Sequence, residues 1–284
     1  AYAIERIGVN CDQYCLDEVR RLDHDRYLTA LLLTAAARSD VLALYAFSLE
    51  VARTREIVSE PILGQIRLQW WRETLEGIYA ETPREHPVVE ALATACQRNQ
   101  LDRGALEALV NAREADMEDT PPSDLAALET YGRETSGQLS ELVMRVLGGD
   151  DIAITTARKI GTAWALVGLA RSVAFHAQSQ RIYIPEDLLT EYEVERRKVL
   201  DLKPTAGLDA AIRRIVERAE ILLREARGAR RNIPAPQRRG LLLATLADRH
   251  IANMRKAGFD PFAFPQLDPA GPIRLTWNAW RNRY

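Results

Sequence analysis

Apolar residues recur at helical spacing along almost all of this 284-residue chain, and no two segments alternate as paired strands would. Proline and glycine divide this pattern into several segments of helix length. Hydrophobic residues make up 47% of the chain, which is enough to fill a sizeable core. No internal repeat, low-complexity linker or shift in composition marks a domain boundary. The sequence therefore predicts an all-α protein with a single helical domain over residues 1–284.

Capping residues indicate where these helices begin. Ser39-Asp40 is expected to cap a helix over 41–60, which Pro61 ends. Asp150-Asp151 is expected to cap a second long helix over 152–176. Further helices are expected at 62–79, 86–99, 103–118, 125–147, 208–230, 236–257 and 275–280.

The charge balance limits the classes of partner. Lys and Arg number 38 against 40 Asp and Glu, a formal net charge of −2, so no overall field would attract nucleic acid. Basic residues gather at 227–231 and 238–239, which we interpret as a solvated helix face, with a phosphate or anionic-membrane contact as the alternative. The apolar run at 28–37 is too short to span a bilayer, and residues 1–25 lack the apolar core of a signal peptide. These features predict a cytoplasmic protein with at most peripheral membrane contact.

Two helix faces carry the residues that matter most. On the first helix, Tyr45, Leu49, Ala52 and Glu56 recur every three or four positions and share a face. Neighbouring glutamates at positions 50, 56 and 60 are expected to pair with arginines at 53 and 55 on a solvated face.

The second face is almost free of large side chains. On the helix over 152–176 it contains Gly161, Ala165, Gly168, Ser172 and His176. Small residues either let another helix approach closely or leave room for a ligand, and both interpretations stay open. His176 has no Cys or second His in register, which favours a helix-end histidine over a metal ligand.

Two further features have ordinary structural explanations. Trp70-Trp71 lies on an amphipathic helix, where core packing is favoured over a cavity wall or partner surface. The acidic run at 114–119 is interpreted as a polar helix end before Pro121, with cation binding as the alternative.

Several blocks of sequence, in this order, point to one family: YAFSLEVARTRE (45–56), IRLQWWRETLEGI (66–78), YGRETSGQL (131–139), GTAWALVGLARSVAFHAQSQRIYIP (161–185) and GLLLATLADRHIANMRKAGFDPF (240–262). Together they resemble the squalene/phytoene synthase family, whose members join two prenyl diphosphates head to head. The resemblance implies an isoprenoid synthase-like helical bundle around a central cavity. It also implies two aspartate-rich motifs that face each other across the cavity mouth and hold Mg²⁺ against the diphosphates.

This chain departs from both motifs. The first family motif has aspartates where the chain has Ala52 and Arg53, and again at Glu56, so that only Glu56 keeps a carboxylate. The second has aspartates at Ser172 and His176, an asparagine at Gly168 and a glutamine at Ala165, and none of these is kept. The residues that match the family are Tyr45, Arg171, Arg181, Tyr183 and Pro185, of which Tyr45 and Arg171 fall where the family contacts diphosphate.

These departures favour a non-catalytic protein with no catalytic residue, metal site or cofactor. Within the family, the segment 49–78 is similar to the branch of respiratory complex I assembly factors, which implies respiratory-complex partners. A prenyl or phosphorylated lipid is the expected ligand. The location implied is cytoplasmic, peripheral at the inner membrane, or the matrix side of that membrane in a eukaryote. The expected ligand-binding residues are Tyr45, Ala52, Arg53, Glu56, Gly168, Arg171 and Ser172.

Two alternatives remain. One is an active head-to-head prenyl diphosphate transferase that uses Mg²⁺ and a displaced acidic set at Glu50, Glu56 and Glu60. The other is a purely structural helical scaffold whose cavity has collapsed.

Overall fold

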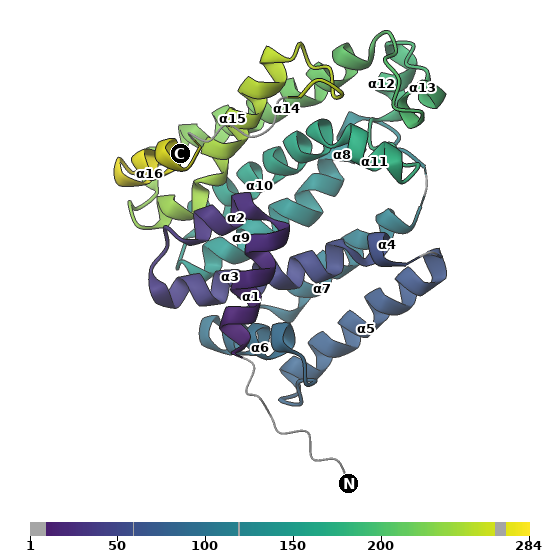
Figure 1. Cartoon of the computed structure of the whole chain (residues 1–284). Coiled ribbons are helices and arrows are strands. Elements are labelled where there is room, and N and C mark those ends of the chain that lie inside the picture. Colours follow the sequence, from purple (N-terminus) through teal and green to yellow (C-terminus); the bar gives the residue numbers. More distant parts are fainter. Residues whose placement is uncertain (1–9, 59, 119, 265–270) are drawn as a thin grey trace. The chain divides into compact units, whose positions relative to one another are not determined.

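The computed structural model describes residues 10–58, 60–118, 120–264 and 271–284 (Figure 1). Every regular element in these ranges is a helix, as the periodicity of the sequence predicts. The chain forms two compact units, Ala1–Glu114 and Ala115–Tyr284. The single domain over 1–284 stays a prediction.

The first unit is built around α3 (Ala35–Ala52), which α1 (Cys11–Leu22) and α6 (Pro87–Asn99) contact. Residues 41–47 of α3 are all buried, as expected for a helix that is apolar on every side. Trp71 lies in this core with its ring centroid 5.2 Å from that of Phe47, so core packing is confirmed for that tryptophan. The other helices of this unit are α2 (His24–Ala30), α4 (Thr54–Ile57), α5 (Pro61–Tyr79) and α7 (Arg103–Ala112).

The second unit is built around α10 (Asp151–Arg171), which packs along α14 (Leu208–Gly228) and also contacts α8 (Leu125–Gly132), α9 (Gln138–Val146) and α15 (Leu243–Lys256). The side chain of Asp150 accepts a hydrogen bond from the Ala153 backbone N–H at 2.9 Å, so the expected cap is present. The remaining helices are α11 (Val173–Gln178), α12 (Glu186–Glu191), α13 (Arg196–Leu200) and α16 (Gly271–Trp280).

The expected cap at Ser39-Asp40 is wrong. Helix α3 begins at Ala35, six residues before the expected start at 41, and Asp40 lies within it. The Asp40 side chain is 5% exposed, and its two oxygens accept hydrogen bonds from Arg98 and Asn99 of α6, each at 2.8 Å. Because this carboxylate is satisfied by tertiary contacts, it does not need to serve as a cap.

Both long helices that carry the motif positions were expected to be continuous, and both predictions are wrong at one residue. A turn at Arg53 separates α3 from α4, and a turn at Ser172 separates α10 from α11. In each case the next residue, Thr54 or Val173, is β-branched and buried, at 0% and 6% exposure. Such residues lose rotamer freedom in a helix, so packing of the buried side chain can determine the local backbone.

The helix expected over 125–147 contains an irregular segment. Residues Arg133–Gly137 form a π-helical turn between α8 and α9. Such turns insert an extra residue into an α-helix and are enriched at functional sites. Residues 237–241 likewise form a 3₁₀ segment before α15, and Arg113–Met117 forms another after α7.

Candidate functional site

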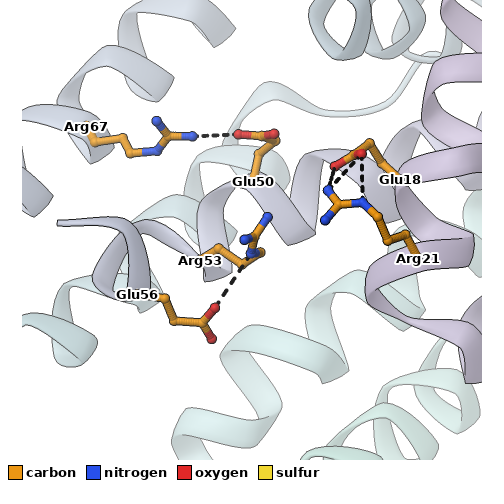
Figure 2. A network of polar contacts seen from close by, with 6 residues as sticks. All are labelled: Glu18, Arg21, Glu50, Arg53, Glu56 and Arg67. Carbon is orange, nitrogen blue, oxygen red and sulfur yellow. Dashed lines mark hydrogen bonds and ion pairs between the residues drawn. The ribbon is translucent and has the colours of Figure 1, made fainter. Parts of the chain in front are cut away.

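The first motif segment, residues 49–56, spans the end of α3, the turn at Arg53 and most of α4. Ala52 and Arg53 are partly exposed and Glu56 is exposed. The Arg53 Nε lies 3.6 Å from a Glu56 carboxylate oxygen (Figure 2), and the two side chains are 33% and 50% exposed. The structure therefore places three of the expected ligand-binding residues together, with the remaining carboxylate in an ion pair with the arginine.

The neighbouring carboxylates of the first unit are also paired with arginines. Glu50 accepts a hydrogen bond from Arg67 of α5 at 2.5 Å, and Glu18 accepts one from Arg21 at 2.6 Å, as Figure 2 shows. Glu50 was expected to pair with Arg53 or Arg55. This prediction is wrong, because Glu50 pairs with Arg67 of α5. Pairing of acidic and basic side chains on a partly solvated face is confirmed for Glu50 and Glu56.

Tyr45 lies inside the first unit, at 4% exposure. The Arg26 guanidinium carbon is 5.6 Å from the centroid of the Tyr45 ring, and Arg26 is itself held by Asp23 at 2.7 Å. Burial raises the pKa of the Tyr45 phenol, so this side chain is a neutral hydroxyl at physiological pH. Its position on the same helix as Ala52 is as expected.

The small-residue face of α10 has two different ends. A Cβ built on Gly161 would lie 2.3 Å from the Ser136 backbone oxygen, so this end packs closely against the π-helical turn. A Cβ on Gly132 would lie 3.1 Å from the Ala165 Cβ, which places Ala165 in close packing too. A Cβ on Gly168 would meet no described atom within 4 Å. Of the two interpretations of this face, close helix packing therefore holds at Gly161, and open space holds at Gly168.

In the second motif segment, residues 165–176, an arginine at the end of α10 contacts two aromatic rings. Arg171, the last residue of α10, has a terminal nitrogen 3.2 Å and 3.4 Å from the two ring nitrogens of His250. The Arg171 guanidinium carbon also lies 5.8 Å from the centroid of the Trp164 ring. His250 and Trp164 are 5% and 6% exposed, so both hold the partly exposed guanidinium from the buried side.

Neither His250 nor Trp164 was among the expected site residues. Both lie within blocks that resemble the family, at 240–262 and 161–185, but no motif distinguishes them from core residues. Trp164 lies two turns before Arg171 on the same face of α10, where it looks like an ordinary core residue. His250 lies on α15, 79 positions from Arg171, so no local sequence pattern links the two. The Gly168, Arg171 and Ser172 positions lie together at the C-terminal end of α10, as expected.

His176 belongs to a second polar cluster of this unit. Its ring centroid is 4.6 Å from that of Tyr183, and its Nδ1 has no hydrogen-bond partner among the described residues. Burial, together with the positive charge of Arg181, lowers the pKa of His176 to about 4. The imidazole is therefore neutral at physiological pH. It lies near the end of α11, in agreement with a helix-end histidine.

A buried carboxylate completes this cluster. Asp116 is 3% exposed and accepts hydrogen bonds from the hydroxyls of Tyr131 and Tyr183, at 2.8 Å and 2.9 Å. The interpretation of 114–119 as a polar helix end is therefore wrong for Asp116, because the two tyrosines satisfy its charge inside the fold. Tyr131 and Tyr183 also line a cavity of about 250 Å³, along with Arg181.

Two negative findings apply to the part of the chain that the structure describes. No three or more His, Cys, Asp or Glu side chains there are grouped closely enough to hold a metal ion. In the same ranges, none of the helices has the length and apolar character needed to cross a membrane.

Known proteins match this chain over most of its length. A family model described as squalene/phytoene synthase matches residues 19–281. A complex I assembly factor 6 from Bos taurus is 30% identical over 96% of this chain and 83% of its own length, and a phytoene synthase from Rhodobacter capsulatus is 27% identical over 87% and 74%.

Solved structures identify the fold. A dehydrosqualene synthase superposes with a TM-score of 0.84 at 18% identity and covers 95% of both chains. A squalene synthase from Alicyclobacillus acidocaldarius superposes with a TM-score of 0.77 at 20% identity, over 88% of this chain and 95% of its own. The expected isoprenoid synthase-like helical fold is thus confirmed. With a matching family model over residues 19–281, the chain belongs to the squalene/phytoene synthase family.

Proposed function

We propose that this chain is a non-catalytic member of its family that binds a prenyl or phosphorylated lipid and acts in the assembly of respiratory complex I. The observation that carries the proposal is the ion pair between Arg53 and Glu56, at 3.6 Å. Mg²⁺ prefers several oxygen ligands and tolerates little departure from octahedral geometry. In the first motif segment the remaining carboxylate has a guanidinium as its neighbour, so this donor set does not fit a magnesium cluster.

The second motif segment supports the same conclusion independently. Its two aspartate positions carry Ser172 and His176, and the His176 imidazole, with its pKa lowered to about 4, is neutral at physiological pH. A neutral imidazole is a poor ligand for a hard cation such as Mg²⁺. Arg171, which is next to Ser172 in sequence, is a cation. The segment is therefore suited to an anion and unsuited to a second metal cluster.

Arg171 is the residue through which we expect an anionic headgroup to bind. His250 and Trp164 hold its guanidinium in place, and a planar guanidinium binds phosphate through two parallel hydrogen bonds. The open space at Gly168 lies one helical turn away and leaves room beside this group. Tyr45, Ala52, Arg53, Glu56 and Ser172 remain proposed ligand-binding residues.

The proposed role in assembly follows from relatives of this chain. The assembly factors from Bos taurus and Homo sapiens are each 30% identical to it, against 27% for the Rhodobacter capsulatus phytoene synthase. They also align over 96% of the chain, so the similarity includes both motif segments. We place this role at the face of the inner membrane that borders the cytoplasm or the mitochondrial matrix.

Catalysis is tested by incubating the purified protein with farnesyl or geranylgeranyl diphosphate and Mg²⁺. We expect neither release of diphosphate nor a condensed hydrocarbon, while the Rhodobacter capsulatus phytoene synthase, assayed in parallel, forms product. A condensed product from this chain would establish the alternative, an active head-to-head prenyl diphosphate transferase. That alternative needs free carboxylates at Glu50, Glu56 and Glu60, of which the first two are in ion pairs.

Ligand binding is tested by titrating farnesyl diphosphate into the protein without metal and measuring the heat. We expect Arg171→Gln to weaken binding at least about tenfold, since hydrogen bonds between charged groups contribute about 1.5–3 kcal/mol each. Arg214→Gln, an exposed arginine of the same unit that pairs with Glu217, is the matched control. Equal affinity of the two variants would remove Arg171 from the proposed site, and no binding by the wild type would favour a collapsed scaffold.

The assembly role is tested in a deletion strain. Complex I activity is expected to fall without the gene and to return with the wild-type copy. It is expected to return only in part with Arg171→Gln if the ligand is needed for assembly. Normal complex I activity in the deletion strain would contradict the assembly role and leave the binding result standing.

A further inference from the structure

Helix α16 (Gly271–Trp280) has apolar side chains on two faces. On the inner face, Leu275 and Ala279 are 2% and 7% exposed, where the helix packs on α15. The Asn278 side chain supports this packing, because its amide nitrogen lies 3.2 Å from the Thr245 hydroxyl oxygen. The inner face accounts for the position of the helix in the second unit, but not for the apolar residues that point away from it.

The outer face consists of Ile273, Trp277 and Trp280, which we call the tryptophan face. Their spacing of four and three residues places them on one side of the helix. They are 75%, 54% and 72% exposed, and the two indole rings lie 5.2 Å apart between centroids. Large aromatic side chains grouped on an exposed surface mark an interaction site more often than scattered apolar residues do.

Exposed cations accompany the tryptophan face. Residues 271–284 contain Arg274, Arg281 and Arg283, all exposed, and no Asp or Glu. The Arg281 guanidinium carbon lies 5.7 Å from the centroid of the Trp277 ring. Aromatic rings and basic groups are thus adjacent on the same exposed surface.

The C-terminal residue joins this surface to a second basic group. The Tyr284 hydroxyl donates to the Ala226 carbonyl at 3.2 Å, and Arg227 donates to the Tyr284 main-chain oxygen at 3.0 Å. Arg227, one of the basic residues noted at 227–231, therefore contacts the residue that follows Arg281 and Arg283.

We propose that the tryptophan face docks on the surface of a lipid bilayer that contains anionic lipid, with α16 lying in the plane of the interface. Tryptophan is enriched at the boundary between headgroups and acyl chains because its ring is apolar and its N–H is polar. Arginines beside such a face attract anionic headgroups. No helix has to cross the membrane in this arrangement, and the inference does not depend on the proposed ligand or on the assembly role.

The charges argue against a second copy of this chain as the occupant. A twofold symmetric interface places a surface patch against itself, so Arg274, Arg281 and Arg283 would meet the same three arginines. Like charges brought together on an interface are unfavourable. Asp248, an acidic residue near Arg274, is already paired with Arg227 at 2.6 Å and so offers no free counter-charge.

The experiment measures co-sedimentation of the full chain with large vesicles of phosphatidylcholine containing phosphatidylglycerol, and with pure phosphatidylcholine. We expect binding to the anionic vesicles that falls as salt rises, and a blue shift of tryptophan emission. Trp277→Ser with Trp280→Ser is expected to weaken binding at least about tenfold, because two buried aromatic rings are lost from the interface. Arg281→Gln with Arg283→Gln is expected to weaken binding about fivefold per charge.

The matched control is Ile62→Ser with Ile66→Ser on α5, which removes apolar side chains that are 54% and 60% exposed in the first unit. This variant should bind vesicles like the wild type, and circular dichroism shows that each variant is folded. Four results would overturn the proposal: no binding to anionic vesicles, equal binding to neutral ones, unchanged binding of the tryptophan variant, or a dimer in light scattering that the tryptophan variant abolishes.

Discussion

A turn of one residue interrupts a helix at Arg53 in the first unit and at Ser172 in the second, and both turns fall at motif positions of the family. Around Arg53 the charged groups are partly exposed and pair with one another, as Glu56 does. Around Ser172 the polar groups are held by buried aromatic and imidazole rings, as Arg171 is by His250. The same loss of aspartates therefore leaves partly exposed ion pairs in one unit and, in the other, a partly exposed guanidinium that buried rings hold from one side.

This difference has a direct consequence for energetics. Ion pairs between exposed side chains contribute little to stability, because solvent screens them and holding two long side chains costs entropy. Buried polar groups contribute much more, since breaking one leaves its partners without hydrogen bonds. Substitutions that remove the buried polar groups near Ser172 should thus cost far more stability than substitutions near Arg53.

The largest effect is expected for Asp116→Ala. Two tyrosine hydroxyls donate to this buried carboxylate, so the substitution should lower the free energy of unfolding by about 4 kcal/mol. Chemical denaturation followed by circular dichroism measures the change. Asp116→Asn, which keeps one acceptor oxygen, should lose about half as much. A loss below about 1 kcal/mol for the alanine variant would mean that the cluster is no more rigid than the surface at Arg53.

The next effect depends on pH. The pKa of His176 is lowered from 6.5 to about 4 in the folded protein, so the unfolded chain binds more protons between these values. Stability from this group is complete above about pH 6.5 and is lost as the pH falls toward 4, by up to about 3 kcal/mol.

His176→Gln removes this titration, so its melting temperature should fall less steeply than that of the wild type as the pH falls from 6.5 to 4. Other acidic groups titrate equally in both proteins and cancel in the difference. The same substitution at the exposed His24 of the first unit is the control. Parallel melting curves for wild type and His176→Gln would show that the ring is solvated like the groups near Arg53.

A pair of glycine substitutions tests the two ends of the α10 face. Gly161→Ala would place a Cβ 2.3 Å from a backbone oxygen and should cost about 2 kcal/mol. Gly168→Ala enters open space within a helix and should stabilise by about 1 kcal/mol, because alanine has the higher helix propensity. The two melting temperatures should therefore shift in opposite directions. Shifts of the same sign would show that the face is uniformly packed or uniformly open.

Much of the fold followed from the sequence. Periodicity predicts the helices, and the cap at Asp150 and the end of α5 at Tyr79 are where the sequence predicts them. The turns at Arg53 and Ser172 were missed, and each precedes a buried β-branched residue, Thr54 or Val173, whose burial is a tertiary property that periodicity does not report. The start of α3 was missed for a related reason, since partners on α6 hold Asp40.

The candidate site could be predicted only where its residues are close in sequence. Ala52, Arg53 and Glu56 are neighbours on one short stretch, and so are Gly168, Arg171 and Ser172. By contrast, the contact of Arg171 with His250 joins α10 to α15, and that of Asp116 with Tyr183 joins segments 67 positions apart. One sequence without its relatives contains no signal for such pairs, because nothing in the local pattern of either segment depends on the other.

The smallest effect is expected at the pair that defines the first motif segment. In a double-mutant cycle with Arg53→Gln and Glu56→Gln, the coupling free energy should be below about 0.5 kcal/mol and should fall further as salt rises. The reference is Arg218 and Glu129 in the second unit, whose two hydrogen bonds of 2.6 Å and 2.8 Å should give a coupling near 1 kcal/mol. If the Arg53 pair coupled more strongly than this two-point pair, its surroundings would have to be far less hydrated than its exposure indicates. The contrast between an ionic surface in one unit and a desolvated cluster in the other would then fail.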